Sequence, residues 1–574
     1  MDHPFTSGSL PFGWNSVPGY WPQRLIYIPT MTSAQRDDEN VYHLDHLQVR
    51  EPEYSTLSYT WGRWRIKGKE AATWPALPVK GTPWAIPPVK DEHFTVEAFS
   101  NVIQQIAKRG GVEWVWVDIG CIDQRRDDPE SNFFNTQAPV EIGRQASIFK
   151  RAKNTYVWLC SLDKAELSTA VDAVQQHGLD FSDYLLGPNS KQAIPDELVQ
   201  NLDDAFSCIF GDPWFSSLWT LQEVVLRNDA LVLSAEGEPV PWTRDASHEQ
   251  NTYLTMFINH CQNVYQDLVS ALALQRTWAT SWRVSDLAIS VMGRTRQQIL
   301  QAGFYYLFST NPNVQYGTAR YRTTTRNEDR VYAIMQIYNI QVGKSARPKE
   351  NPALEVLVTE FAGAISQRSA VLGQYFVHTT DPGHRATWQI TEESFVPDAL
   401  MIYRDPVDLA TIAAGQRGLA VATGTCCRFP ALLQASQEDG VRNSAFARNG
   451  MGLDFDVFFD GQGQGERAYA FRYPFRLPVS RGVGSHNGGS EPSQMDYQQV
   501  LVLHLGHLQG VPNPNWKQKE FSRRHVGLLL YPVEQGAPGE AVFRRLGVCI
   551  WSDRWSGDLL ERIEWVAHYN ILLQ

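Results

Sequence analysis

Glu223 is the one acidic residue of a predicted helix that begins near Trp214. A carboxyl group at such a position could act as a general acid or base, or stabilise a developing positive charge. The apolar stripe of this helix is formed by Trp214, Leu218, Leu221 and Val225. Glu223 lies nearly opposite the stripe, so periodicity alone favours a solvated carboxylate that pairs with Arg227, an interaction worth about 0.2–0.5 kcal/mol. A catalytic Glu223 is the alternative reading.

Two further groups of candidate residues follow predicted strands at their carboxyl ends. The strand in YSTLSYTWGRWR (54–65) stops at a glycine that is flanked by Trp61, Arg63, Trp64 and Arg65. A tight turn requires the glycine but not the aromatic and basic residues, whereas a ligand pocket would use both. Asp118 and Asp123 follow the second strand, in DIGCIDQ (118–124). The two tryptophans could instead belong to the core, and the two aspartates could cap turns.

The elements that would position these residues alternate between strands and helices. Strands are predicted at 24–29, 54–59, 112–118, 155–162 and 230–237, with helices at 95–109 and 139–153 and two more within 201–228, separated by a break at Gly211-Asp212-Pro213. Nearly continuous apolar strands separated by helices predict a parallel sheet covered on both faces. Ligands of such sheets bind at the carboxyl ends of the strands. We therefore expect a doubly wound α/β domain over roughly residues 20 to 240, with a pocket at that edge.

The rest of the chain changes character twice. Helical periodicity dominates from 241 to 375, for example in 253–275 and 327–340, and alternating strands dominate from 376 to 574. The strand predictions there include a hairpin at 453–475 and strands at 497–509 and 525–533. We predict three parts, at 1–240, 241–375 and 376–574. His504 and His507 have metal-like spacing but lie in a strand pattern, where their side chains point to opposite faces, so no metal site is expected.

Composition limits the classes of function. The formal net charge of the 574-residue chain is −11, which argues against general nucleic-acid or anionic-membrane binding. The seven cysteines form no CxxC pair and are typical of reduced thiols. The amino terminus does not resemble a signal peptide, and no apolar stretch approaches the roughly 18 residues of a membrane span. We expect a cytoplasmic protein with no membrane span.

Three blocks of the sequence, in this order, resemble the fungal heterokaryon-incompatibility (HET) domain. They are YSTLSYTWG (54–62), WVWVDIGCIDQ (114–124) and WFSSLWTLQEVVL (214–226), and TRNEDRVYAIMQI (325–337) is similar to a segment that commonly follows this domain. The resemblance covers about residues 20 to 235 well. It implies a protein that triggers cell death when genetically different fungal cells fuse.

The HET domain is in turn similar to the TIR domain, a parallel α/β fold. SLWTLQEV (217–224) resembles the S-x-W-C-L-x-E-L pattern of TIR domains, whose Glu is catalytic in the NAD-cleaving members. The resemblance therefore implies a TIR-like sheet, an NAD glycohydrolase with Glu223 as the catalytic residue, and no cofactor beyond NAD as substrate. The residues expected to contact the nucleotide are Ser58, Tyr59, Trp61, Gly62, Arg63, Asp118, Asp123, Gln124 and Trp219. TIR-type sites are often completed by self-association, so another copy of the chain or an unknown protein is an expected partner.

The chain departs from the HET pattern at two places. Ser217 stands where relatives usually carry Arg, and an acid and an amide are exchanged at Gln137 and Glu141. The exchange is expected to place a second acid near the site. The alternative to an enzyme is a non-catalytic signalling or partner-binding module of an incompatibility or immune pathway, and the missing Arg favours it.

Overall fold

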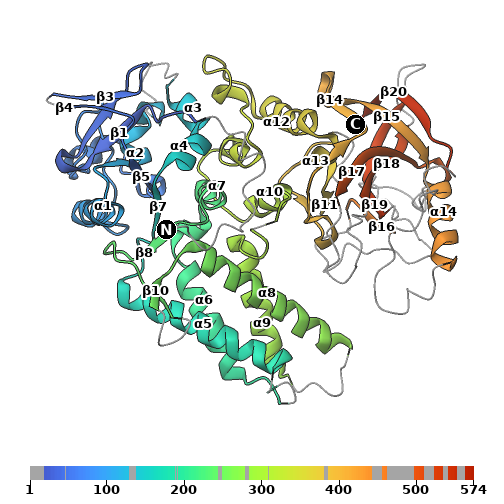
Figure 1. Ribbon diagram of the computed structural model, residues 1–574, viewed down its shortest axis with the longest axis horizontal. Helices are drawn as coiled ribbons and strands as arrows, with labels where there is room; N and C mark the ends of the chain where they lie inside the picture. Colours follow the sequence, from blue (N-terminus) through green and yellow to red (C-terminus); the bar gives the residue numbers. More distant parts are fainter. Residues whose placement is uncertain are drawn as a thin grey trace, which may run out of the picture. The chain divides into compact units, whose positions relative to one another are not determined.

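The protein is described by a computed structural model that falls into two compact units (Figure 1). The described residues are 19–45, 47–127, 137–187, 189, 192–243, 249–277, 284–307, 309–380, 386–442, 455–461, 497–509, 523–533, 541–552 and 563–574. The first unit contains Met1–Phe308 and Thr318–Pro352, and the second contains Ser309–Gly317 and Ala353–Gln574.

A six-stranded sheet in the order β2-β1-β6-β5-β7-β8 forms the centre of the first unit. Its strands are β1 (Arg24–Tyr27), β2 (Thr32–Gln35), β5 (Tyr54–Ser58), β6 (Trp114–Trp116), β7 (Asn154–Trp158) and β8 (Leu231–Leu233). The last four run parallel, as predicted. The expectation of an entirely parallel sheet is wrong for β1, which runs antiparallel to both β2 and β6. A single 3-10 turn, Ile28–Thr30, joins β1 to β2, and so short a connection permits only antiparallel pairing.

The order of the parallel strands creates one position where the chain reverses direction across the sheet. From β5 the chain passes to β6 on one side and then returns to β7 on the other side of β5. Such a reversal leaves a crevice at the carboxyl ends of the two central strands, and ligands of open α/β sheets bind there. The switch point of this sheet therefore lies beyond Ser58 of β5 and Trp158 of β7.

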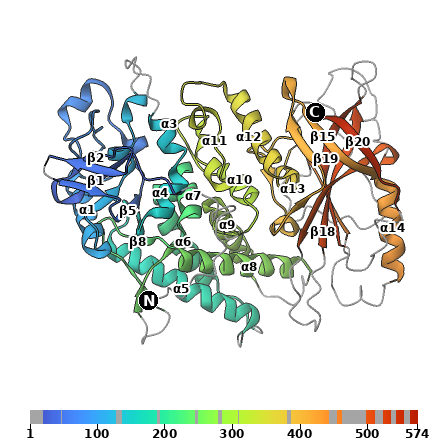
Figure 2. The same cartoon turned by 45° about the horizontal axis from the view of Figure 1, so that its top comes forward.

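Helices cover both faces of the sheet, and Figure 2 shows α1 (Val96–Gly110) on one side of β5 with α4 (Gln145–Arg151) and α7 (Leu218–Leu226) on the other. Phe99 of α1 packs against Tyr59 and Trp158, whereas Phe149 of α4 packs against Trp116. Thr95 caps the start of α1, and Gly111 ends it in a left-handed conformation with φ of 58°. The sheet is thus buried on both faces, as its apolar strands predict.

Four further helices of the first unit are 15 to 24 residues long. They are α5 (Lys164–Leu186), α6 (Asp196–Phe210), α8 (Leu254–Thr277) and α9 (Asp286–Ala302), which pack on one another. Short elements follow at α11 (Asp329–Tyr332) and in the 3-10 helix η7 (Met335–Tyr338). The helix predicted over 327–340 is therefore only one short α-helical turn and a 3-10 turn. None of the helices in the described ranges is long and apolar enough to cross a membrane.

The second unit is built on an antiparallel-rich sheet, as its alternating sequence predicts. Its strands include β15 (Ala420–Arg428), β16 (Phe455–Phe459), β17 (Leu501–Gln509), β18 (Arg523–Val533), β19 (Val542–Ser552) and β20 (Val566–Leu573). Since β15 pairs with both β17 and β20, the path β15-β17-β18-β19-β20 closes on itself. Of the hairpin predicted at 453–475, the structure describes only 455–461, where β16 pairs with β19; the rest lies outside the described residues.

All seven cysteines are free thiols.

Candidate functional site

The Glu223 carboxyl is held by a chain of hydrogen bonds at the switch point of the sheet. The Ser58 hydroxyl donates a short hydrogen bond to Oε2 of Glu223. The Trp214 indole Nε1 donates to Ser58 Oγ at 2.8 Å. Ser58 and Trp214 are both buried, whereas Glu223 keeps partial access to solvent. The carboxyl of this partly buried residue is therefore held by Ser58, which is itself held by Trp214.

Strand geometry explains why Ser58 meets α7. Side chains alternate between the two faces of a strand, so Tyr54, Thr56 and Ser58 point to the face that α4 and α7 cover. Tyr54 confirms this assignment, because its hydroxyl donates to the Ile148 carbonyl of α4 at 2.7 Å. Tyr59 lies on the opposite face, among the aromatic residues that pack on α1.

Asp212 fixes the start of the segment that carries Trp214 and Glu223. One of its oxygens accepts from the Trp214 backbone N–H at 2.8 Å, and the other accepts from Ser161 N at 2.9 Å and Ser161 Oγ at 2.7 Å. Ser161 lies just beyond β7, so Asp212 ties the helix entrance to the carboxyl end of a central strand. Burial raises the pKa of Asp212, while its three donors lower it.

Arg322, a buried residue, stabilises the same segment at the start of α7. Its fully buried guanidinium donates to the carbonyls of Trp214 at 3.3 Å, Ser217 at 3.0 Å and Ala302 at 2.5 Å, and to Thr220 Oγ1 at 2.9 Å. Burial lowers the pKa of Arg322 to about 9. A guanidinium therefore lies at the backbone of Ser217.

Burial raises the pKa of Glu223 to about 8. The Ser58 hydrogen bond lowers the pKa, and the negative charge of Asp118 raises it. Asp118 accepts from Trp61 Nε1 at 2.7 Å and from the Ile119 N–H at 2.7 Å. The structure thus brings together Ser58, Trp61, Asp118 and Glu223, which the sequence singled out in three separate blocks.

The prediction that Glu223 is a solvated carboxylate paired with Arg227 is wrong, because the Arg227 guanidinium binds other groups. The Arg227 guanidinium donates to the carbonyls of Phe149 at 2.9 Å and Ala152 at 2.8 Å, and it pairs with Asp229 at 2.7 Å. The α7 helix is buried on nearly every side, so its wheel has no solvated face opposite the apolar stripe.

The loop beyond β5 presents three of the remaining candidates. Arg63 Nη1 donates to Ser216 Oγ at 3.3 Å, which brings the loop to the entrance of α7. Trp64 stacks on His93 with ring centroids 3.7 Å apart, and His93 Nε2 donates to the Thr60 carbonyl at 2.6 Å. Gly62 is exposed, and a Cβ atom added to it would meet no protein atom within 4 Å. The fold itself therefore gives no steric reason for a glycine at 62.

Three other candidates make contacts within the protein. Asp123 is buried and forms a two-pronged ion pair with Arg125, with a shortest distance of 2.6 Å. Gln124 Nε2 braces the turn by donating to the carbonyls of Asp118 at 3.1 Å and Ile122 at 2.8 Å. Trp219 Nε1 donates to Asp329 at 3.2 Å. These contacts give all three residues a role in holding loops and helices.

The exchanged pair Gln137 and Glu141 lies apart from Glu223. Glu141 is fully buried and accepts from the Gln23 N–H at 3.1 Å and from Trp116 Nε1 at 3.3 Å. Burial raises the pKa of Glu141 to about 7. The groups that act electrostatically on Glu223 are Ser58 and Asp118, so Glu141 does not serve as the second acid of that site.

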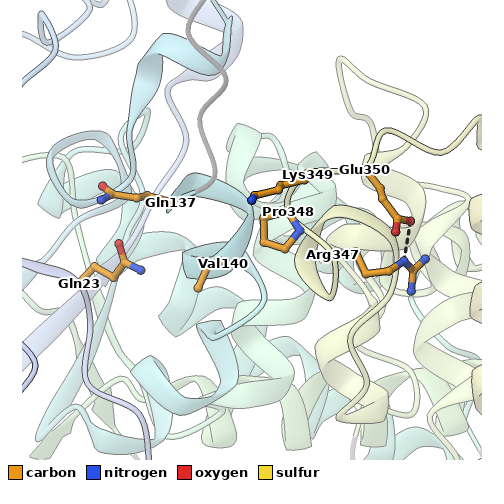
Figure 3. Close-up of a pocket in the computed structure, with 7 residues that line it drawn as sticks. All are labelled: Gln23, Gln137, Val140, Arg347, Pro348, Lys349 and Glu350. Atoms are coloured by element: carbon orange, nitrogen blue, oxygen red, sulfur yellow. Dashed lines mark hydrogen bonds and ion pairs between the residues drawn. The ribbon is translucent and has the colours of Figure 1, made fainter.

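A pocket of about 470 Å³ lies on the side where Glu141 is buried. Its lining residues, shown in Figure 3, are Gln23, Gln137, Val140, Arg347, Pro348, Lys349 and Glu350. Arg347 and Glu350 pair at 2.6 Å. None of the candidate residues at the strand ends lines this pocket. Within the ranges that the structure describes, no group of three or more His, Cys, Asp or Glu side chains is arranged to hold a metal ion.

The segment that carries the Trp214–Ser58–Glu223 chain is similar to a known family. Residues 54–223 match the family model described as Heterokaryon incompatibility protein (HET). This segment is similar to a HET domain. The HET-like segment begins at the first residue of β5 and ends at Glu223, so it contains the whole chain of hydrogen bonds. No curated protein and no solved structure gives a match.

The sequence did not identify four residues that shape the HET-like segment and its support. Periodicity places Trp214 in an apolar stripe and Asp212 in a break between two helices, and it does not mark His93 or Arg322. The Gly-Asp-Pro-Trp sequence at 211–214 is a usable signal, because an Asp before a Pro at a helix start is typical of a cap. His93 and Arg322 act over long sequence separations, and no local pattern points to them.

Proposed function

We propose that the HET-like segment cleaves the nicotinamide–ribose bond of NAD or a related nucleotide, with Glu223 as the catalytic carboxyl. The reaction would serve an incompatibility or cell-death response in the cytoplasm, and would require no cofactor beyond the substrate. The supporting observation is the position of the Glu223 carboxyl at the switch point, hydrogen-bonded to Ser58 and beside Asp118. The similarity of SLWTLQEV to the TIR catalytic block suggests this reaction.

The chemistry suits a carboxylate. Breaking the bond to nicotinamide passes through an oxocarbenium-like transition state, as in glycoside hydrolysis. The leaving group changes from a cationic pyridinium to neutral nicotinamide, so it requires no proton from the enzyme. An ionised Glu223 could stabilise the positive charge that develops on the ribose. The exposed Arg63 and the open backbone at Gly62 would face the pyrophosphate.

The test is nicotinamide release from NAD by the full chain and by Glu223→Gln. We expect release by the natural chain and a loss of at least 100-fold in the variant, a typical cost of removing a group that stabilises transition-state charge. Glu113→Gln is the matched control. Glu113 is exposed at the amino end of β6, at the opposite edge of the same sheet, so this variant should keep full activity.

The alternative is a non-catalytic module that signals through a protein partner. The replacement of the usual Arg by Ser217 favours it, because no guanidinium side chain emerges from that position. Absence of release from the folded natural chain, with unaltered nucleotide binding in Glu223→Gln, would support the module and contradict the enzyme.

A further inference from the structure

When Glu223 is ionised, chemistry fixes the direction of both hydrogen bonds at Ser58. An indole N–H can donate but cannot accept, so Ser58 Oγ must accept from Trp214 Nε1. The Ser58 proton is then left for its other neighbour, Oε2 of Glu223. Trp214, Ser58 and Glu223 therefore form a directed relay in which each group has one defined role.

The parts of this relay are rigid. The Trp214 ring is fully buried and packs edge-on against Phe215, and its backbone is held by Asp212 and Arg322. Ser58 ends a central strand that pairs with a neighbour on each side. Neither donor can follow the carboxyl if its side chain rotates, so the relay selects one orientation of Glu223.

We propose that Ser58 and Trp214 are positioning residues that orient the Glu223 carboxyl and leave its Oε1 atom to meet the substrate. The proposal rests on the proposed function for its substrate, but the orientation itself does not depend on NAD. Ser58, which the sequence suggested as a nucleotide contact, is thereby assigned to the carboxyl rather than to the ligand.

The charged groups around the carboxyl determine how the relay can be detected. Asp118 of α2 (Asp118–Cys121) acts on Glu223 with a like charge, Arg63 is directed to Ser216, and Arg227 is bound to carbonyls of α4 and the residue after it. Ser58 is the group that favours the ionised form. Its removal must therefore raise the pKa of Glu223 further.

The first experiment follows the pH dependence of NAD cleavage in Ser58→Ala and Trp214→Phe. Loss of a hydrogen bond to a charged group corresponds to a shift of about one to two pH units. In Ser58→Ala we expect the rising limb of kcat to move upward by that amount, with kcat about ten- to 100-fold lower at neutral pH and KM changed by less than about two-fold. Trp214→Phe should shift the limb in the same direction by less, because the serine hydroxyl remains.

Ser55→Ala is the matched control. Ser55 lies on the same strand, is equally buried and faces α1, and its hydroxyl makes no hydrogen bond in the structure. This variant should leave the pH profile unchanged. A Ser58→Ala profile that coincides with that of the natural chain would overturn the relay.

A second readout does not require activity. The difference in melting temperature between each serine variant and its Glu223→Gln double variant is measured over a series of pH values. This difference shows a transition at the pH where Glu223 ionises, because ionisation is linked to folding. An upward shift of that transition in Ser58→Ala, in a natural chain that does not cleave NAD, would support the relay and reject only the proposed function. An unmoved transition would reject the relay whatever the activity.

Discussion

At the scale of single residues, burial raises the pKa of Glu223 to about 8, although the residue as a whole is only partly buried. If its ionised form stabilises the ribose cation, NAD cleavage must increase with pH through that value. Only about a tenth of the carboxyl is ionised at pH 7, against about nine tenths at pH 9. We expect kcat/KM to rise about ten-fold between these values, measured as nicotinamide release in overlapping buffers. A profile that falls over this range would instead assign Glu223 the role of a proton donor.

Glu141 allows a prediction on stability at the same scale. Burial raises its pKa from 4.5 to about 7. The stability that this group contributes is therefore complete below about pH 4.5 and is lost as pH rises through about 7. The Glu141→Gln variant keeps an oxygen for the Gln23 N–H but cannot ionise. Relative to the natural chain, its free energy of unfolding should rise by about 2.5 kcal/mol between pH 5 and pH 8.5.

Urea unfolding at a series of pH values measures this difference. The exposed Glu113→Gln should show no comparable trend. A Glu141→Gln curve that stays parallel to that of the natural chain would mean that Glu141 is not a buried, ionisable group in the folded protein.

At the scale of elements, local periodicity predicted the strands and helices that position the site. The parallel strands β5 to β8 and the break at 211–213 before α7 follow directly from apolar runs and from Gly-Asp-Pro. The long helix α5 was not predicted, and neither was α14 (Phe429–Arg442) within the β-rich part. The helical periodicity of α7 wrongly predicted a solvated polar face, because the polar residues of this helix make tertiary contacts. Gln222, for example, donates to Gln145 at 2.6 Å in a buried position that periodicity alone marks as polar.

Arg322 provides the prediction for the entrance of α7. Replacing it by Met would remove the guanidinium that donates to the carbonyls of Trp214, Ser217 and Ala302. The Thr220 hydroxyl, with its single proton, can then serve only one of the first two carbonyls. Since unsatisfied buried groups are costly, we expect Arg322→Met to lower the free energy of unfolding by about 3 kcal/mol or more. Chemical denaturation followed by tryptophan fluorescence measures the loss.

Arg50→Met is the matched control for this change. Arg50 is exposed and pairs with Glu39 at 3.4 Å on the surface, a contact of a kind that contributes little. Equal losses in the two variants would contradict the supporting role of Arg322 and reduce the effect to a general loss of charge.

At the scale of the molecule, the sequence predicted two changes of character along the chain but not how the resulting parts pack. Helices α8 and α9 belong to the first compact unit, where they pack on α5 and α6. Helical periodicity shows that a face is apolar without showing which neighbour covers it. Local sequence patterns also cannot predict that the β-rich sheet closes through β15, because more than 70 residues separate β15 from β17.

The two units give a last prediction, since each has its own buried guanidinium. Arg545 of the second unit donates to Asp460 at 3.0 Å and to Gln374 Oε1 at 2.8 Å, and lies 4.1 Å from the centre of the Phe376 ring. Chains of several units often unfold in more than one step. In differential scanning calorimetry, Arg545→Met should lower the transition of the second unit, while Arg322→Met lowers that of the first. If both variants shift one single transition by similar amounts, the units fold together, and damage in either would also remove the Glu223 site.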